Sequence, residues 1–293
     1  MIHAEQLDKA IDDLGLADRP TIVHTSLRSF GEPLDGGADA LLDALLARGL
    51  TVVVPSFTEP QFGVTPVADL RPERNGIDYT ALLDRRNDRV YRPDCGLVNP
   101  TLGAFPATVI RRTDAVRGTH PLNSFAAIGP RAAELIAEQS PTDVYGPILG
   151  LAALGGVVLQ IGVGLTTMTV LHLAEQRSGR RLFLRWARDA DGEVRAVEVG
   201  SCSKGFGRLE PVLRPHRTTA TVGSSLWQAY PVADVLTAAT AAIAANQDIT
   251  RCSGSDCPTC RDSVAGGPIG VTTWAERPSP WTGVVSRLSP RRA

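Results

Sequence analysis

The stretch Val157-Val-Leu-Gln-Ile161, continued by Gly162-Val-Gly-Leu-Thr-Thr-Met-Thr-Val-Leu-His-Leu-Ala-Glu175, decides the fold class of this chain. Its first five residues are almost entirely apolar and predict a buried strand, which Gly162 and Gly164 end. From Thr166 the spacing of the apolar residues becomes helical. A buried strand that leads through a glycine turn into a helix is typical of open α/β sheets, which bind ligands beside the carboxyl ends of their strands.

Three polar side chains are expected on one face of this helix. Thr169, His172 and Glu175 follow one another at intervals of three residues, so they share a face. A neutral imidazole held by a carboxylate can take a proton from a substrate amine or hydroxyl at neutral pH, which contributes roughly 10²–10⁴ in rate. The spacing alone also fits a helix with one structural histidine and one exposed glutamate.

Strand–loop–helix units around this stretch predict an α/β domain with a mixed, mostly parallel central sheet flanked by helices. Further strands are expected at residues 21–24, 51–55 and 218–222, and a β-hairpin at 181–188 and 193–199. Helices are expected at residues 4–14, 38–47, 102–112, 131–139, 147–154, 203–212 and 232–245. Residues 1–265 are assigned to one domain, and residues 266–293, rich in Gly, Pro and Ser, to an irregular tail.

Residues 57–100 interrupt this regular order because they are rich in proline, and between Asp69 and Asp94 acidic and arginine side chains balance. Such a segment makes a poor core. We expect an excursion on the substrate side, with one short helix near residues 77–86, that serves as a lid or a binding loop. The balanced charge does not by itself indicate a cationic substrate.

The composition excludes several classes of protein. The chain has 293 residues, of which 43% are hydrophobic and 21% are charged, and a net charge of −1. These values predict a soluble globular protein that binds neither nucleic acid nor anionic membranes. Residues 146–171 lack charged side chains, but glycines and Pro147 interrupt them, which favours a helix followed by a buried strand over a membrane span. The N-terminus has no pattern of a secretion signal, so we expect a cytoplasmic protein.

The cysteines predict a metal site. Cys252, Cys257 and Cys260 lie within nine residues, one ligand short of a tetrahedral site, and Cys202 could complete the set. Four thiolates leave no open coordination position, so a bound zinc would be structural and would stabilise a subregion at residues 200–262. The alternative is a group of reduced thiols without metal.

Other catalytic motifs are missing. The sequence contains no Gly-x-Ser-x-Gly elbow and no phosphate loop that ends in Gly-Lys-Ser/Thr. Gly162 and Gly164 lack the third glycine of a dinucleotide-binding turn. Among the remaining histidines, His3 and His216 are expected in solvent, whereas His24 ends a buried strand, where a structural role is at least as plausible as a functional one.

Five segments together resemble the aminoglycoside 3-N-acetyltransferases, also called the antibiotic N-acetyltransferase family. They follow in the order and spacing of that family and span roughly residues 5–245. These segments are Val23-His-Thr-Ser-Leu-Arg-Ser-Phe-Gly31, Val54-Pro-Ser-Phe-Thr58, Thr119-His-Pro-Leu-Asn-Ser-Phe-Ala-Ala-Ile-Gly129, Tyr145-Gly-Pro147 and Thr169-Val-Leu-His-Leu-Ala-Glu175. The resemblance implies the fold of that family and an acyl-coenzyme A-dependent amine N-acyltransferase.

The resemblance also assigns roles to residues. His172 matches the general base, Glu175 would orient it or hold the helix in place, and His120 and Ser124 would line the cleft near the thioester. The loop expected to contact the pantetheine and phosphate portion of the coenzyme consists of Ser26, Leu27, Arg28, Ser29 and Phe30. Arginine and loop amides suit this role as charge-assisted donors to phosphate.

The implied reaction is direct transfer from acetyl-coenzyme A to an amine, without a covalent acyl-enzyme. The expected acceptor is an aminoglycoside-type antibiotic. One alternative is a biosynthetic N-acyltransferase for another secondary-metabolite amine. Two observations keep it open: the excursion is charge-balanced, and Arg117-Gly-Thr-His-Pro121 replaces the Arg-Ser-x-His-Pro that is more typical of the family. A zinc-stabilised binding protein without catalysis is a third hypothesis, and a homodimer is one alternative for the oligomeric state.

Overall fold

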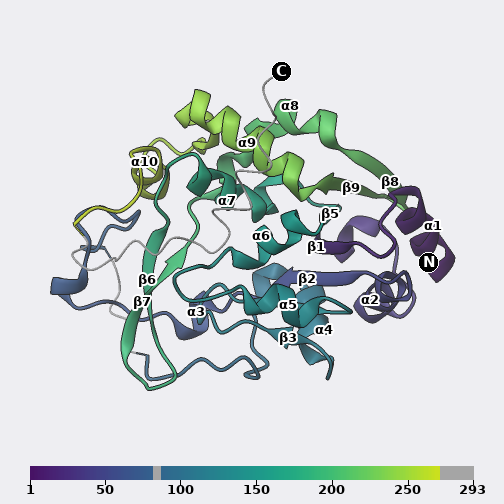
Figure 1. Cartoon of the computed structure of the whole chain (residues 1–293), viewed down its shortest axis with the longest axis horizontal. Helices are drawn as coiled ribbons and strands as arrows, with labels where there is room; N and C mark the ends of the chain where they lie inside the picture. Colours follow the sequence, from purple (N-terminus) through teal and green to yellow (C-terminus); the bar gives the residue numbers. More distant parts are fainter. Residues whose placement is uncertain (82–86, 271–293) are drawn as a thin grey trace.

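The computed structural model describes residues 1–81 and 87–270, and its centre is a seven-stranded sheet in the order β3-β4-β2-β1-β5-β9-β8 (Figure 1). The three central strands β1 (Pro20–Thr25), β2 (Thr51–Pro55) and β5 (Val157–Ile161) are parallel. The outer pairings are antiparallel and involve β3 (Val116–Arg117), β4 (Phe125–Ile128), β8 (Thr218–Val222) and β9 (Ser225–Pro231).

A mixed sheet is therefore confirmed, but parallel pairing is confined to its centre. The sequence predicts a mostly parallel sheet because neither β4 nor β9 is predicted as a strand. β4 is only four residues long, and β9 returns directly from β8 through a tight turn instead of following a helix. Each of these strands adds antiparallel pairings to the parallel centre.

Helices cover both faces of the sheet because its buried strands alternate their side chains between two hydrophobic clusters. Val53 of β2 packs into one cluster, whereas Val52 and Val54 pack into the other. The Val53 face is covered by α5 (Ala132–Ala137), α6 (Gly146–Ala153), α7 (Val170–Arg177) and α9 (Val232–Ala245). The opposite face is covered by α1 (Ala4–Asp13), α2 (Gly37–Ala47) and α4 (Ala104–Arg111).

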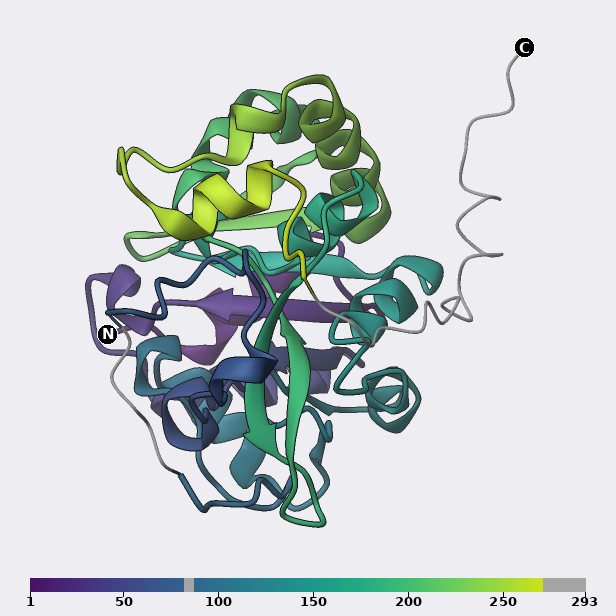
Figure 2. The ribbon, with the colours of Figure 1, turned by 90° about the vertical axis from the view of Figure 1, so that its left-hand side faces the viewer.

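The excursion at residues 57–100 packs against a long hairpin that lies outside the central sheet (Figures 1 and 2). The hairpin consists of β6 (Phe183–Arg188) and β7 (Val194–Val199), as predicted. Phe62 of α3 (Glu59–Phe62) and Tyr91 join Phe183 in a third hydrophobic cluster. The short helix predicted near residues 77–86 is absent over residues 77–81, and residues 82–86 lie outside the described part.

The segment after β7 contains short helical turns that carry the cysteines. Ser203–Leu209 (η5) leads into α8 (Glu210–Leu213), and Gln247–Thr250 (η7) follows α9. The helix α10 (Pro258–Val264), which the sequence does not predict, closes this segment. Only residues 266–270 of the expected irregular tail lie within the described part. Throughout residues 1–81 and 87–270, every helix falls short of the length and apolar character that crossing a bilayer requires.

Candidate active site

A cavity of about 880 Å³ opens at the carboxyl ends of the three parallel strands. Its wall includes residues 23–28 at and beyond the end of β1, Pro55 and Phe57 at and beyond the end of β2, and Val163 and residues 166–169 after β5. Residues 100–106, which lead into α4 and form its first turn, also line the cavity. The cavity thus occupies the edge of the sheet at which open α/β folds bind their ligands.

The predicted coenzyme loop borders this cavity with only part of its length. Ser26, Leu27 and Arg28 line the wall. Ser29 turns inward, where its Oγ donates to the Ser26 carbonyl at 2.6 Å and lies 2.7 Å from Ser225 Oγ. Phe30 is fully buried and packs edge-on against Trp227. The side chains of Ser29 and Phe30 therefore lie outside the cavity lining and support the loop, and a contact of these two residues with the coenzyme stays a prediction.

His172 and Glu175 form a hydrogen-bonded pair at the cavity wall. One helical turn of α7 places His172 Nδ1 3.0 Å from Glu175 Oε2, as their spacing predicts. His172 and Thr169 line the cavity, while Glu175 lies behind them with its side chain 4% exposed. On its other side, Glu175 Oε1 accepts a hydrogen bond from Arg180 Nη1 at 2.5 Å. The alternative interpretation of this helix, in which Glu175 is exposed to solvent, is therefore excluded.

The surroundings of Glu175 fix its charge. Burial by itself raises the pKa of this carboxyl, but hydrogen bonds from His172 and Ser201 and the charge of Arg180 outweigh burial and hold the pKa below its usual value. An ionised Glu175 accepts the Nδ1–H of His172, which leaves Nε2 as the basic nitrogen of the imidazole. The pair can therefore take a proton from a group that enters the cavity.

The His172 ring is held between two aromatic side chains that sequence reasoning misses. Tyr145 stacks on it with the ring planes 11° apart, and Phe206 contacts it with ring centroids 4.8 Å apart. Gly200 completes the contact, because a Cβ at this position would lie 2.7 Å from His172 Cγ. The Tyr145-Gly-Pro segment is the only signal in the sequence that could have indicated this packing.

His120 and Ser124 do not belong to the described cavity lining, and their approach to the thioester stays a prediction. His120 is fully buried; its Nε2 lies 2.8 Å from the Glu198 carbonyl, and its Nδ1 accepts the amides of Leu122 and Asn123. Burial lowers the pKa of His120 to about 4, so the ring is neutral and holds the loop. Ser124 is likewise buried and bonds to Ser56, and only Asn123 between them reaches the cavity.

His24 at the end of β1 is a candidate that sequence reasoning leaves undecided. It lines the cavity, and burial lowers its pKa to about 4, so the imidazole is neutral at pH 7. Among the described residues, no group forms a hydrogen bond with the buried Nε2 of His24. An unpaired polar atom of this kind is costly unless a ligand or water pairs with it. The structure therefore makes His24 a candidate ligand contact.

Charge around the cavity has one sign. Arg28 is the only lining side chain in the described part of the chain that carries a formal charge at neutral pH, apart from the titratable histidines. No aspartate or glutamate of residues 1–81 and 87–270 belongs to the lining. The cavity is thus suited to an anionic or neutral group near residues 26–28, and its described lining offers no carboxylate to a polycation.

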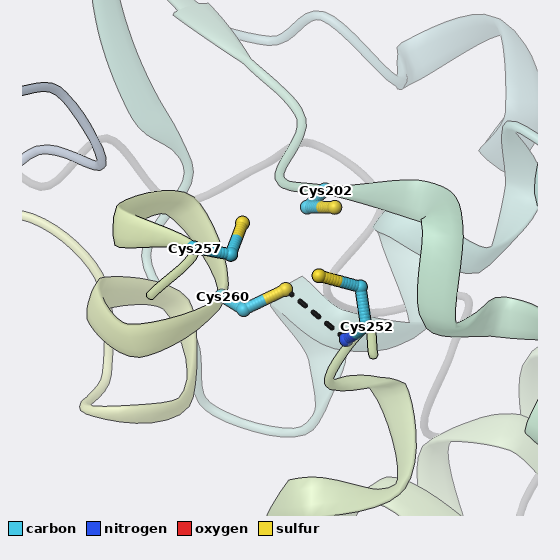
Figure 3. Close-up of side chains that lie close together, drawn as sticks. All are labelled: Cys202, Cys252, Cys257 and Cys260. Carbon is cyan, nitrogen blue, oxygen red and sulfur yellow. Dashed lines mark hydrogen bonds between the residues drawn. The ribbon is translucent and has the colours of Figure 1, made fainter. Parts of the chain in front are cut away.

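The predicted cysteine cluster is assembled by the fold. The Sγ atoms of Cys202, Cys252, Cys257 and Cys260 all lie within 4.8 Å of one another (Figure 3). Cys202 precedes η5, Cys252 follows η7, and the other two flank the first turn of α10. A tetrahedral zinc with Zn–S bonds of ~2.3 Å requires sulfur atoms roughly 3.8 Å apart, which this arrangement fits. Four thiol groups also fit the preference of zinc for soft ligands.

Comparisons with known proteins agree with this architecture. Residues 22–244 match the family model described as aminoglycoside 3-N-acetyltransferase. Aminoglycoside N(3)-acetyltransferase IX of Micromonospora chalcea is 34% identical over 227 residues, which cover 69% of this chain and 77% of that relative.

Solved structures share the fold. The apoenzyme of the aminoglycoside acetyltransferase AAC(3)-IVa superposes with a TM-score of 0.71 at 24% identity, over 91% of this chain and 97% of that chain. A histidine-to-alanine mutant of the same enzyme in complex with gentamicin superposes with a TM-score of 0.72 at 24% identity, over 90% and 97%. With its sequence matched over most of its length and its fold shared, the chain belongs to the aminoglycoside 3-N-acetyltransferase family.

Proposed function

We propose that this protein transfers the acetyl group of acetyl-coenzyme A to an amine of an aminoglycoside-type antibiotic, with His172 as general base. The observation that carries the proposal is the pair of His172 and Glu175 at the wall of the same cavity that Ser26, Leu27 and Arg28 line. The gentamicin complex of a structural relative supports an aminoglycoside acceptor.

The coenzyme would bind along residues 26–28 and the start of α4. Arg28 supplies a charge-assisted donor for phosphate. The first amides of α4, which follow the lining residue Gly103, have no partners within their helix and favour a negative charge. These contacts would place the thioester toward His172, which lines the same cavity.

The reaction then proceeds by direct transfer. Nε2 of His172 accepts a proton from the attacking amine, the amine nitrogen forms a bond to the thioester carbon, and the carbon–sulfur bond breaks to release the coenzyme thiolate. Glu175 stabilises the imidazolium that forms, as the buried carboxylate of a catalytic triad does. No covalent intermediate is needed, because the acceptor amine is itself the nucleophile.

A second candidate acceptor is an amine of another secondary metabolite that carries fewer positive charges than an aminoglycoside. The observation that favours it is the absence of acidic side chains from the described cavity lining. A site that binds a polycation tightly is expected to offer carboxylates, because charged partners left unpaired on binding are costly. The two acceptors therefore differ in the charge that the cavity can tolerate.

Thiol release from acetyl-coenzyme A tests both candidates. Purified protein is incubated with the coenzyme and either gentamicin-type aminoglycosides or monoamines of similar size. Faster turnover of aminoglycosides supports the first candidate, and faster turnover of monoamines supports the second. His172→Ala should abolish turnover while acetyl-coenzyme A still binds. Binding without any turnover of either amine class would instead favour a binding protein without catalysis.

We further propose that the four cysteines hold a structural zinc ion. Their sulfur atoms form a closed four-thiolate set, and none of them lines the cavity, so the ion would act on the fold and not on the acceptor. Metal analysis of the purified protein tests this proposal, since one zinc per chain is expected. Cytoplasmic location and a homodimer stay predictions, and native mass spectrometry tests the latter.

A further inference from the structure

The cysteine cluster lies directly behind the hydrogen-bond partners of Glu175. Ser201, Thr250 and Ser263 each bond to Glu175 or to its partner Arg180. Each of them lies within three residues of a cysteine of the cluster. The three neighbouring pairs are Ser201 with Cys202, Thr250 with Cys252, and Ser263 with Cys260.

These bonds converge on both oxygens of the carboxylate. Ser201 Oγ donates to Glu175 Oε2, the oxygen that also accepts Nδ1–H of His172. Thr250 Oγ1 donates to Oε1 at 3.2 Å and accepts from Arg180 Nη1 at 2.7 Å. Ser263 Oγ lies 3.3 Å from the same Nη1. The direction of the carboxylate, and hence of the His172 ring, depends on where these hydroxyl groups are held.

The hydroxyl groups come from three separate segments of the chain. Ser201 follows β7, Thr250 ends η7, and Ser263 lies on α10, and no disulfide joins these described segments. The segments pack closely, since a Cβ at Gly205 of η5 would lie 2.1 Å from the Thr250 carbonyl. Glu175, Arg180, Cys202 and Cys260 border one small pocket, so the two clusters lie side by side.

We propose that a zinc ion held by Cys202, Cys252, Cys257 and Cys260 positions Glu175 and, through it, His172, so that metal occupancy sets the rate of acetyl transfer. The inference rests on the proposed function. The ion has no open coordination site and takes no part in bond making. Because the cysteines lie outside the cavity, the loss of metal should lower kcat and leave binding of the coenzyme unchanged.

Cys257→Ser is the most informative variant, because Cys257 is the one cysteine of the four without a neighbour in the Glu175 network. We expect zinc to fall from one per chain to near zero and kcat to fall by ~10–100-fold, the usual effect of losing support behind a functional group. The dissociation constant of acetyl-coenzyme A should not change. Cys95→Ser, which removes the cysteine outside the cluster, should alter neither zinc nor kcat.

A double-mutant cycle separates positioning from general weakening of the fold. Ser201→Ala removes the hydroxyl that transmits the position of Cys202 to Glu175. If the metal acts through this bond, Cys257→Ser should lower kcat much less in the Ser201→Ala background than in the wild type. Additive losses in the cycle would overturn the proposal.

Nitrogen NMR of His172 gives a measurement that does not depend on turnover. The zinc-loaded protein should show the proton on Nδ1, and chelation of zinc should shift this tautomer toward a mixture that added zinc reverses. An unchanged tautomer after complete loss of zinc would overturn the inference, as would unfolding of both the chelated wild type and Cys257→Ser. A wild type without acetyl transfer would refute the proposed function, while the tautomer would still decide this inference.

Discussion

At Gly200, the packing around His172 leaves no room for a side chain. An alanine Cβ would lie 2.7 Å from His172 Cγ and 2.5 Å from Tyr145 Oη, whereas ordinary contacts begin at 3.4 Å. The backbone of Gly200 does not adopt a positive φ, so the conflict is purely steric. To relieve it, the imidazole has to move by ~0.7 Å away from its position beside Glu175, the difference between the ordinary and the imposed contact.

The size of the effect follows from this displacement. A misplacement of about 1 Å costs up to ~10²-fold in rate, so Gly200→Ala should lower kcat/KM by ~10–100-fold, or about 1.4–2.7 kcal/mol of transition-state stabilisation. Overpacking should also lower the free energy of unfolding by about 1–3 kcal/mol. Steady-state thiol release measures the first effect, and thermal unfolding followed by circular dichroism measures the second.

Gly207→Ala provides the matched control. Gly207 lies in the neighbouring turn η5, and a Cβ there would meet no atom of the described chain within 4 Å. This variant should keep both the activity and the melting temperature of the wild type. The reasoning about His172 fails if Gly200→Ala retains full activity, or if Gly207→Ala loses as much activity as Gly200→Ala does.

Three further outcomes follow from individual groups. Glu175→Gln should lower the free energy of unfolding by about 3–5 kcal/mol, because the buried Arg180 loses its counter-charge. Urea unfolding measures this loss, and an unchanged midpoint would contradict it. Arg28→Ala should raise the KM for acetyl-coenzyme A by ~10-fold or more with kcat nearly unchanged, since a hydrogen bond to a charged group contributes about 1.5–3 kcal/mol. A lower kcat at constant KM would contradict a phosphate contact of Arg28. The pKa of His120 is about 4 in the fold and about 6.5 in an unfolded chain, so the unfolded chain binds more protons between these values. The stabilisation that this neutral histidine provides is therefore complete above pH ~6.5 and decreases as the pH falls toward 4. In urea titrations across this range, His120→Asn should show a shallower pH dependence than the wild type, and an equal slope would contradict the assignment.

The pairing of His172 with Glu175, which we propose to be catalytic, follows from local sequence, because its geometry is local. His172 and Glu175 are one helical turn apart, so the spacing by itself predicts their hydrogen bond. The boundaries of β1, β2 and β5 follow equally well from short apolar runs. The orientation of residues 26–30 did not follow from the sequence. A 3₁₀ turn directs Ser29 and Phe30 into the protein interior, and only residues 26–28 line the cavity.

Long-range contacts decided what the sequence leaves open. The resemblance places His120 and His172 in the same cleft, and only the fold buries His120 against the Glu198 carbonyl. Arg180 follows α7 directly, and its guanidinium is held beside Glu175 by hydrogen bonds to the distant residues Gln247 and Thr250. The aromatic contacts of His172 arise in the same way, since Tyr145 and Phe206 lie on separate segments.

The sequence by itself determined the α/β class, the pairing of His172 with Glu175 and the set of four cysteines that could share a metal. Each depends on residue type and on spacing along the chain, which survive without knowledge of the fold. Only the tertiary structure decided the antiparallel flanks of the sheet, the lining of the cavity and the link between the cysteines and Glu175. These features depend on which distant segments pack together, and packing maximises burial over the whole chain rather than within any one stretch.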